Sequence, residues 1–322
     1  MQFVRRRFDK GNSSVVRSLM VLPLIASIIS VPRPQQRDGD PFAIAVNVEL
    51  VVFNITVVDS RGHHIAGLKS ADFRVLEEGR RQDIRFFEAE DAPASVGILI
   101  DNSGSMRNKR SVVHDAALDF VRASKSSDDM FVLYFNERVH MGLPFGIPFT
   151  NDANRMRAAF DGLMPGGMTA LYDAIVAGLA HVAVGTRERR ALIVFSDGGD
   201  NASRHRLDDV LNLARKSSAT IYAIGMYDRE DPDKNPGVLK KIAEASGGRA
   251  YFPRSLENVE EVWREIAGEI RSQYTLGFLP GQSPYGPSFR NVKIDVTGRK
   301  NLSVVTRKGY AVEALSGSTE IQ

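Results

Sequence analysis

Three short polar segments, far apart in the chain, carry oxygen ligands of the kind that bind a hard cation. They are Asp101-Asn102-Ser103-Gly104-Ser105, Gly166-Gly167-Met168-Thr169 and Ser196-Asp197-Gly198. Two carboxylates, of Asp101 and Asp197, stand beside three hydroxyls, of Ser103, Ser105 and Thr169. Mg²⁺ prefers oxygen ligands in near-octahedral geometry and keeps several waters, which suits a set with few charges. The sequence therefore predicts one divalent-cation site, left incomplete and with room for a partner's carboxylate.

The elements around these segments predict that the segments meet at one edge of a sheet. Residues 96–100 and 191–195 are apolar runs, typical of buried parallel strands, and the motifs at Asp101 and Ser196 follow directly. In open α/β sheets, ligands bind beyond the carboxyl ends of the strands. Thr169 must arrive from a loop, which two glycines before it allow to turn sharply, and residues 171–184 then have a helical pattern.

At these motifs the chain resembles the von Willebrand factor A (VWA) domain family, whose Asp-x-Ser-x-Ser, Thr and Asp motifs form a metal-ion-dependent adhesion site (MIDAS). All of the motif positions match, and the resemblance covers about residues 94–273. It implies that Ser103, Ser105 and Thr169 touch the metal directly. It also implies that Asp101 and Asp197 act largely through bound water. The implied cofactor is Mg²⁺, or else Mn²⁺ or Ca²⁺.

Residues beside the motifs are the candidates for contact with a partner, namely Gly167, Met168, Gly198 and His205. Because neutral hydroxyls leave the cation's charge poorly compensated, a protein ligand that offers an Asp or Glu carboxylate would complete the coordination sphere. We therefore expect a binding module for adhesion or complex assembly, not an enzyme. Two alternatives remain open. In the first, the chain is an envelope assembly protein whose cation is purely structural. In the second, the chain is a metal-dependent hydrolase that uses the same cleft.

Motifs of the common enzyme and nucleotide-binding classes do not occur. The chain has no Gly-x-Ser-x-Gly elbow, no His-Glu-x-x-His zinc motif and no Gly-x-x-x-x-Gly-Lys phosphate loop. Beyond residue 31, acidic and basic side chains nearly balance, which argues against a nucleic-acid partner. Basic clusters at 187–190 and 204–206 lack neighbouring aromatic residues, so we expect them to be solvated charges.

The amino-terminal residues predict export. Residues 1–31 combine a basic start with an apolar stretch at 19–31, as in a secretory signal peptide. This stretch is shorter than the roughly 20 residues of a membrane-spanning helix. We therefore expect a periplasmic or extracellular protein, with an N-terminal membrane anchor as the alternative. Membrane contact would come only through this leader if it is not cleaved. There is no cysteine for a disulfide or a lipid.

The remaining periodicity divides the chain into further segments. After a linker at 32–41, an N-terminal β-module is expected at 42–92, the VWA domain at 93–273, C-terminal β-strands at 274–312 and a tail at 313–322. The expected fold class is α/β, a Rossmann-like, doubly wound and mostly parallel sheet. We expect the two β segments to pair as one small antiparallel β-sandwich, into which this domain is inserted. Helices are expected at 111–123, 152–163, 207–217, 236–246 and 256–272, and an edge strand with a loop at 139–149.

Overall fold

The computed structural model describes residues 50–160, 166–227, 234–281, 289–299 and 301–311. All of them belong to one of the chain's two compact units, Asn47–Gln322. The predicted signal peptide, linker and tail lie outside the described residues. In the part of the chain that is described, none of the helices has the length and apolar character needed to span a bilayer.

A six-stranded sheet forms the centre of the α/β domain, with the strand order β10-β9-β8-β5-β6-β7. Its strands are parallel except for the edge strand β7, which runs antiparallel to β6. In chain order they are β5 (Ala94–Asp101), β6 (Asp129–Phe135), β7 (Val139–Met141), β8 (Arg189–Ser196), β9 (Thr220–Gly225) and β10 (Ala250–Tyr251). The central strands β5, β8 and β9 are buried along almost their whole length, as their apolar runs predict.

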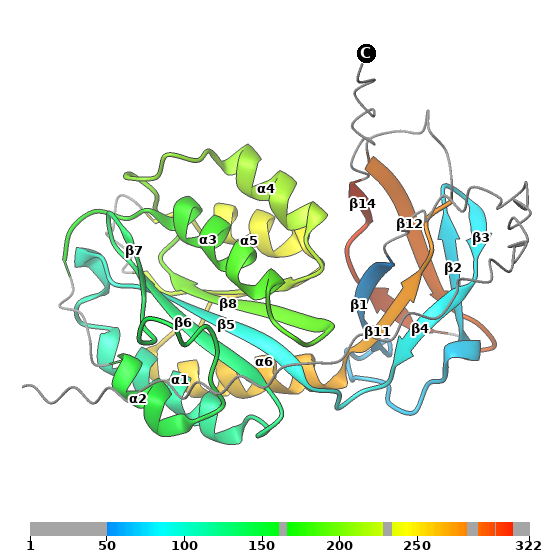
Figure 1. Ribbon diagram of the computed structural model, residues 1–322, viewed down its shortest axis with the longest axis horizontal. Coiled ribbons are helices and arrows are strands. Elements are labelled where there is room, and N and C mark those ends of the chain that lie inside the picture. Colours follow the sequence, from blue (N-terminus) through cyan, green and yellow to red (C-terminus); the bar gives the residue numbers. More distant parts are fainter. Residues whose placement is uncertain (1–49, 161–165, 228–233, 282–288, 300, 312–322) are drawn as a thin grey trace, which may run out of the picture. The chain divides into compact units, whose positions relative to one another are not determined.

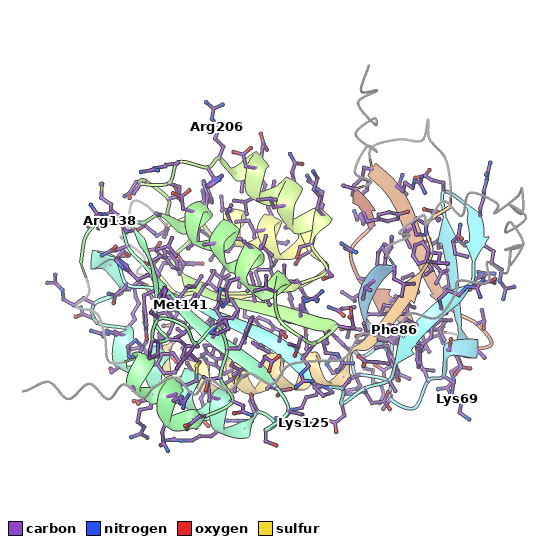
Figure 2. All side chains as sticks on the ribbon, in the orientation of Figure 1. Lys69, Phe86, Lys125, Arg138, Met141 and Arg206 are labelled. Atoms are coloured by element: carbon purple, nitrogen blue, oxygen red, sulfur yellow. The ribbon has the colours of Figure 1, made fainter. Side chains whose placement is uncertain are left out.

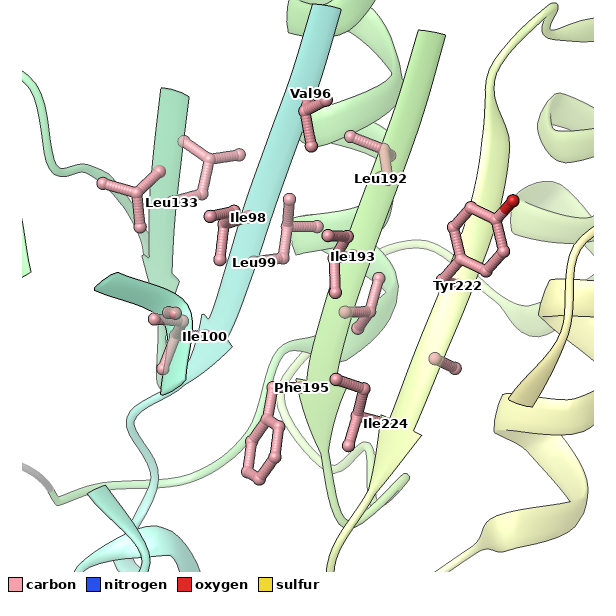
Figure 3. Packing of buried hydrophobic residues seen from close by; sticks show 14 of the residues in the cluster. Val96, Ile98, Leu99, Ile100, Leu133, Leu192, Ile193, Phe195, Tyr222 and Ile224 are labelled. Atoms are coloured by element: carbon pink, nitrogen blue, oxygen red, sulfur yellow. The ribbon is translucent and has the colours of Figure 1, made fainter. Parts of the chain in front are cut away.

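Helices cover both faces of this sheet (Figure 1), with α3, α4 and α5 on one side and α1, α2 and α6 on the other. The helices are α1 (Arg110–Ala123), α2 (Ala153–Phe160), α3 (Leu171–Ala183), α4 (Leu207–Lys216), α5 (Pro236–Ala245) and α6 (Val259–Ser272). Figure 3 shows apolar side chains of neighbouring strands, such as Ile98, Ile193 and Ile224, packed side by side in this core. A Cβ at Gly97 in β5 would lie 2.3 Å from the Phe131 ring, so only glycine allows this close approach.

A second hydrophobic core lies in a sandwich of two antiparallel sheets. Their strand orders are β13-β1-β11-β4 and β14-β12-β2-β3, so each sheet mixes strands from both ends of the described chain. The strands are β1 (Val51–Val58), β2 (Phe73–Glu77), β3 (Arg80–Gln82), β4 (Ile84–Glu88), β11 (Tyr274–Phe278), β12 (Phe289–Val296), β13 (Ser303–Val305) and β14 (Gly309–Ala311). The expected fold class, a doubly wound α/β domain inserted into a small β-sandwich, is thereby confirmed.

Two buried arginines join the sandwich to the α/β domain. The guanidinium of Arg189 donates hydrogen bonds to the carbonyls of Ala89, Ala92, Ile270 and Gln273. The guanidinium of Arg307 donates to carbonyls at the end of α4 and to that of Val52 in β1. Arg189 is fully buried, so the expectation that the 187–190 cluster is solvated is wrong for this residue. Burial lowers the pKa of both side chains, that of Arg307 to about 10, so Arg307 stays charged at neutral pH.

Several element boundaries differ from those expected. The helix expected at 256–272 is a 3-10 turn, η3 (Leu256–Asn258), followed by α6. The 139–149 segment forms an edge strand of only three residues, β7. The short strand β10 was not expected, because a segment of two residues shows no periodicity, whereas β14 lies within the C-terminal β-strands expected at 274–312. Further 3-10 turns lie at η1 (Ser70–Asp72) and η2 (Gly104–Met106).

Candidate metal centre

Asp101 is the last residue of β5 and is held at the carboxyl end of the sheet. Its carboxylate accepts a hydrogen bond of 2.7 Å from the hydroxyl of Ser196, the last residue of the neighbouring strand β8. The other carboxylate oxygen accepts one of 2.9 Å from the backbone N–H of Ser103. Only 2% of Asp101 is exposed. No ion pair of Asp101 occurs in the described part of the chain.

This environment is electrostatically costly for a carboxylate. Burial raises the pKa of Asp101 to about 6, and the nearby negative charge of Asp197 acts in the same direction. The hydrogen bonds from Ser103 and Ser196 oppose this rise without cancelling it. A cation within a few ångströms favours the charged form of a carboxyl group. The local electrostatics therefore suit a bound cation.

The hydroxyl motif brings three further groups together. The hydroxyls of Ser103 and Ser105 lie 3.2 Å apart, and Ser105 donates a hydrogen bond of 2.5 Å to the carboxylate of Asp197. The second oxygen of Asp197 accepts a hydrogen bond of 2.9 Å from the backbone N–H of Gly199. The turn η2 makes this possible, because it folds Ser105 back over the ends of the strands. Residues 92 positions apart in the chain thus come into contact.

Thr169 lies in a loop that is tied to both other motifs through the backbone. Its N–H donates to the side chain of Asn201 at 2.8 Å, and its carbonyl accepts from the N–H groups of Asn201 and Ala202. Two residues earlier, the carbonyl of Gly167 accepts a hydrogen bond from the N–H of Gly104 at 3.3 Å. All three predicted segments therefore form one surface, although the ligand role of each residue remains a prediction.

The residues proposed for partner contact lie in different environments. Gly167, at a positive φ of 83°, and Met168 are exposed at the rim of the site, and Met168 is 54% exposed. Gly198 is buried, and a Cβ there would lie 2.4 Å from the carbonyl oxygen of Asn235. His205 is exposed, but its ring lies 2.7 Å from the carboxylate of Asp173 at the start of α3.

A fourth loop, which the sequence did not lead us to expect, completes this surface. Asn136, Glu137 and Arg138 form the turn between β6 and β7, and the carbonyl of Asn136 accepts a hydrogen bond of 2.7 Å from Ala170. The exposed Glu137 carboxylate lies against Gly167, where a Cβ would be 1.9 Å from it. One signal could have found this turn, because it is a polar segment directly after the apolar run of β6.

The ligand types decide which metals the site fits. Among the described residues, no three His, Cys, Asp or Glu side chains gather closely enough to hold a metal ion. The candidate site instead combines two carboxylates with hydroxyl oxygens. That set suits a hard divalent cation better than a soft one, and the residues present fit such a group.

Comparisons with known proteins agree with this architecture. The von Willebrand factor type A domain matches residues 95–265, just over half of the chain. A UPF0353 protein of Mycolicibacterium vanbaalenii is 25% identical over 286 residues, which cover 78% of this chain and 82% of that protein.

Solved structures show likeness of fold. The proximal thread matrix protein 1 of the mussel byssus, with a zinc-occupied MIDAS motif, has 16% identity and a TM-score of 0.50, covering 62% of this chain and 50% of its own. The von Willebrand factor type A protein of Catenulispora acidiphila has 16% identity and a TM-score of 0.49, covering 82% of this chain and 74% of its own. On the match to residues 95–265, this chain belongs to the von Willebrand factor type A domain family.

Proposed function

We propose that this protein is a binding module that uses a divalent cation to capture an acidic side chain of a partner protein. The observation that carries the proposal is the buried carboxylate of Asp101, which has no ion pair among the described residues and lies in one hydrogen-bonded group with other oxygen ligands. The proposed ligands of the cation are Asp101, Ser103, Ser105, Thr169 and Asp197. Mg²⁺ is the first candidate, with Mn²⁺ or Ca²⁺ as alternatives.

The cation and the residues around it would have separate roles in binding a partner. The cation would supply positive charge and an open coordination position for a carboxylate oxygen. Ser103 and Thr169 are buried, whereas Ser105, Gly167 and Met168 are exposed, so this side of the site faces solvent. A partner would therefore approach over Ser105 and the exposed Met168 side chain. The zinc in the MIDAS motif of the mussel protein supports a divalent cation here.

Backbone hydrogen bonds favour a binding role over a purely structural one. Gly104 bonds to Gly167 and Gly166 to Asn102, while the carbonyl of Thr169 accepts two N–H groups from the next loop. These bonds join the loops through the backbone itself, which supports a binding role for the cation. A hydrolase would need a general base at the cation. The ring of His205, on the same loop as Asp197, is instead held by Asp173.

We also propose that the protein acts outside the cytoplasm, on the basis of the signal-peptide pattern in residues 1–31. An adhesion or assembly module needs no catalytic group, which agrees with the proposed lack of enzymatic activity.

Calorimetric titration with Mg²⁺ and Mn²⁺ tests the cation site. The parent protein should bind one ion saturably, and Asp101→Asn should lose binding. Asp173→Asn is the matched control, because it removes the same charge from the same end of the domain but lies outside the proposed ligand set. Equal binding by the parent and Asp101→Asn, or no binding by the folded parent, would refute the site.

A second measurement separates capture of a partner from a structural role. With EDTA present, the parent should keep a single cooperative unfolding transition and its native circular dichroism, while it loses metal-dependent binding of an acidic protein ligand. A structural site predicts the opposite result, namely loss of folded structure on chelation.

A further inference from the structure

The loops around the candidate site carry exposed arginines that have no acidic partner among the described residues. They are Arg107 after the hydroxyl motif, Arg138 in the turn between β6 and β7, and Arg204 and Arg206 before α4. None of these guanidinium groups forms an ion pair within the described residues. Figure 2 shows Arg138 and Arg206 projecting away from the ribbon of the α/β domain. We call these four residues the arginine rim.

Hydrogen bonds place the arginine rim on the same surface as the candidate site. The N–H of Arg107 bonds to the carbonyl of Gly104, inside the hydroxyl motif. The turn that carries Arg138 accepts the N–H of Ala170, the residue after Thr169. The N–H of Arg204 donates to Asp173 in the first turn of α3, and this helix begins directly after the Thr169 loop.

Most acidic residues on these loops and at the starts of α3 and α4 accept hydrogen bonds from backbone N–H groups instead of pairing with the rim. Asp173 accepts N–H groups from Arg204 and His205, and Asp200 accepts the N–H of Tyr172. Asp209, which is exposed together with Asp208 in the first turn of α4, accepts the N–H of Arg206. Glu137 is the exception, because its exposed carboxylate lies against Gly167. Within residues 101–109, 136–138, 166–170 and 196–206, the exposed charged side chains are thus mostly positive.

We infer that the partner presents several carboxylates in one short acidic segment, of which one reaches the cation while its neighbours pair with the arginine rim. This inference rests on the proposed cation-dependent capture and adds the chemical class of the partner. Guanidinium groups bind carboxylates in a planar, two-bonded geometry, which favours arginine for this task. A partner that presents a single carboxylate on an otherwise neutral surface would leave the arginine rim without ion pairs.

A nucleic acid is the competing polyanion, and the loops argue against it. Residues 101–109, 136–138, 166–170 and 196–206 contain no Phe, Tyr or Trp. Single-stranded nucleic acids are commonly bound by stacking bases on such aromatic side chains. An acidic protein segment needs only charge and hydrogen bonding, which the rim supplies.

Fluorescence anisotropy with defined probes tests the inference. Two labelled peptides of equal length are compared in saturating Mg²⁺, one with a single Glu in a Gly-Ser sequence and one with five successive Glu residues. The five-Glu peptide should bind at least about tenfold more tightly. This advantage should shrink between 0.05 M and 0.5 M NaCl, because salt screens exposed charges.

Variants assign the effect to the rim. Arg107→Gln, Arg138→Gln and Arg204→Gln together should weaken binding of the five-Glu peptide about tenfold, since each exposed pair contributes a factor of about two to five. The matched control combines Arg61→Gln, Arg80→Gln and Arg81→Gln, three exposed residues of the sandwich, and should leave binding unchanged. Glu137→Gln removes a repelling charge and should strengthen binding about twofold.

The outcomes separate this inference from the cation site itself. Equal affinity for the two peptides, no binding of either, or an unchanged affinity in the triple rim variant overturns the inference. A ten-nucleotide oligothymidine that binds as tightly as the five-Glu peptide overturns it as well. Calorimetric Mg²⁺ binding is measured on the same samples and must be retained by the rim variant. If five-Glu binding persists in Thr169→Ala or in EDTA, the rim stands and cation-dependent capture fails.

Discussion

Two buried carboxylates, one in the sandwich and one in the α/β domain, have opposite surroundings. Glu77 in β2 is 4% exposed and accepts hydrogen bonds from Arg290, Tyr310, Gln82 and the N–H of Gly281. Burial alone would raise the pKa of Glu77, but the hydrogen bonds from Tyr310, Arg290 and Gly281 outweigh it and hold the pKa below its usual value. Asp101 is equally buried, and burial raises its pKa.

The difference lies in the hydrogen-bond donors and in the counter-charge. Glu77 has the guanidinium of Arg290 at 2.9 Å, so the sandwich contains the cation that its buried acid needs. Asp101 has a hydroxyl and an N–H as partners and a second carboxylate, of Asp197, nearby. A buried acid without a counter-charge costs stability, and such costs are typical of functional sites. The sandwich therefore supplies a counter-charge to its buried acid, whereas the described part of the α/β domain supplies none to Asp101.

Removal of the internal cation should have the largest effect. Arg290→Met leaves the carboxylate of Glu77 buried and uncompensated, so the free energy of unfolding should fall by about 3–5 kcal/mol. Urea denaturation followed by circular dichroism measures this change. Lys293→Gln, on the same strand with a side chain 72% exposed, is the control and should change stability by less than about 0.5 kcal/mol. If Arg290→Met lowered the free energy of unfolding by less than about 1 kcal/mol, Glu77 would not depend on its counter-charge, and the contrast with Asp101 would be refuted.

The pH dependence of stability should be opposite for the two acids. Without divalent cations, folded protein keeps a proton on Asp101 between about pH 4 and pH 6, where the unfolded chain has released it. The free energy of unfolding should therefore fall as pH rises through this window, by up to about 3 kcal/mol at 1.4 kcal/mol per pKa unit. The pKa of Glu77 is lowered, so its contribution is present at neutral pH and is lost as pH falls through its folded-state pKa.

Asp101→Asn isolates the first of these effects. The difference in unfolding free energy between the parent and this variant, measured in EDTA from pH 4 to pH 7, should follow the Asp101 titration. Saturating Mg²⁺ should weaken the pH dependence of this difference, because the bound cation favours the ionised carboxylate. A difference that does not change with pH would show that Asp101 titrates normally and that its site needs no cation.

The sequence predicted the α/β site better than the sandwich cluster, for a physical reason. Asp101 and Ser196 each follow a long apolar run, and parallel neighbouring strands bring their carboxyl ends to one edge. Glu77 and Arg290 are 213 positions apart, and each lies in a strand with ordinary alternation, so no local pattern links them. Arg189 was misjudged because the carbonyls that it binds come together only in the folded chain.

Removal of one hydroxyl from each region should affect Mg²⁺ affinity in the α/β domain and stability in the sandwich. Ser105→Ala removes a proposed cation ligand and the hydrogen bond to Asp197, so Mg²⁺ affinity should fall about tenfold, which is 1.4 kcal/mol. Its unfolding free energy without cation should change by less than about 1 kcal/mol, since Ser105 is exposed. Tyr310→Phe is the counterpart in the sandwich and should cost stability without any change in Mg²⁺ affinity. Calorimetry and urea denaturation on both variants give the two values.

The variant with the smallest expected effect tests whether a side chain of the α/β domain itself acts as a counter-charge at the site. His205 is the candidate, because its ring lies 2.7 Å from Asp173 on the site's own surface. This pair is partly exposed, with side-chain exposures of 46% for His205 and 22% for Asp173, and exposed pairs contribute about 0–1 kcal/mol. His205→Gln should therefore change unfolding free energy by less than about 0.5 kcal/mol and Mg²⁺ affinity less than twofold. If Mg²⁺ instead bound several-fold more tightly to this variant, His205 would be competing with the metal, and the contrast with Arg290 would be one of degree.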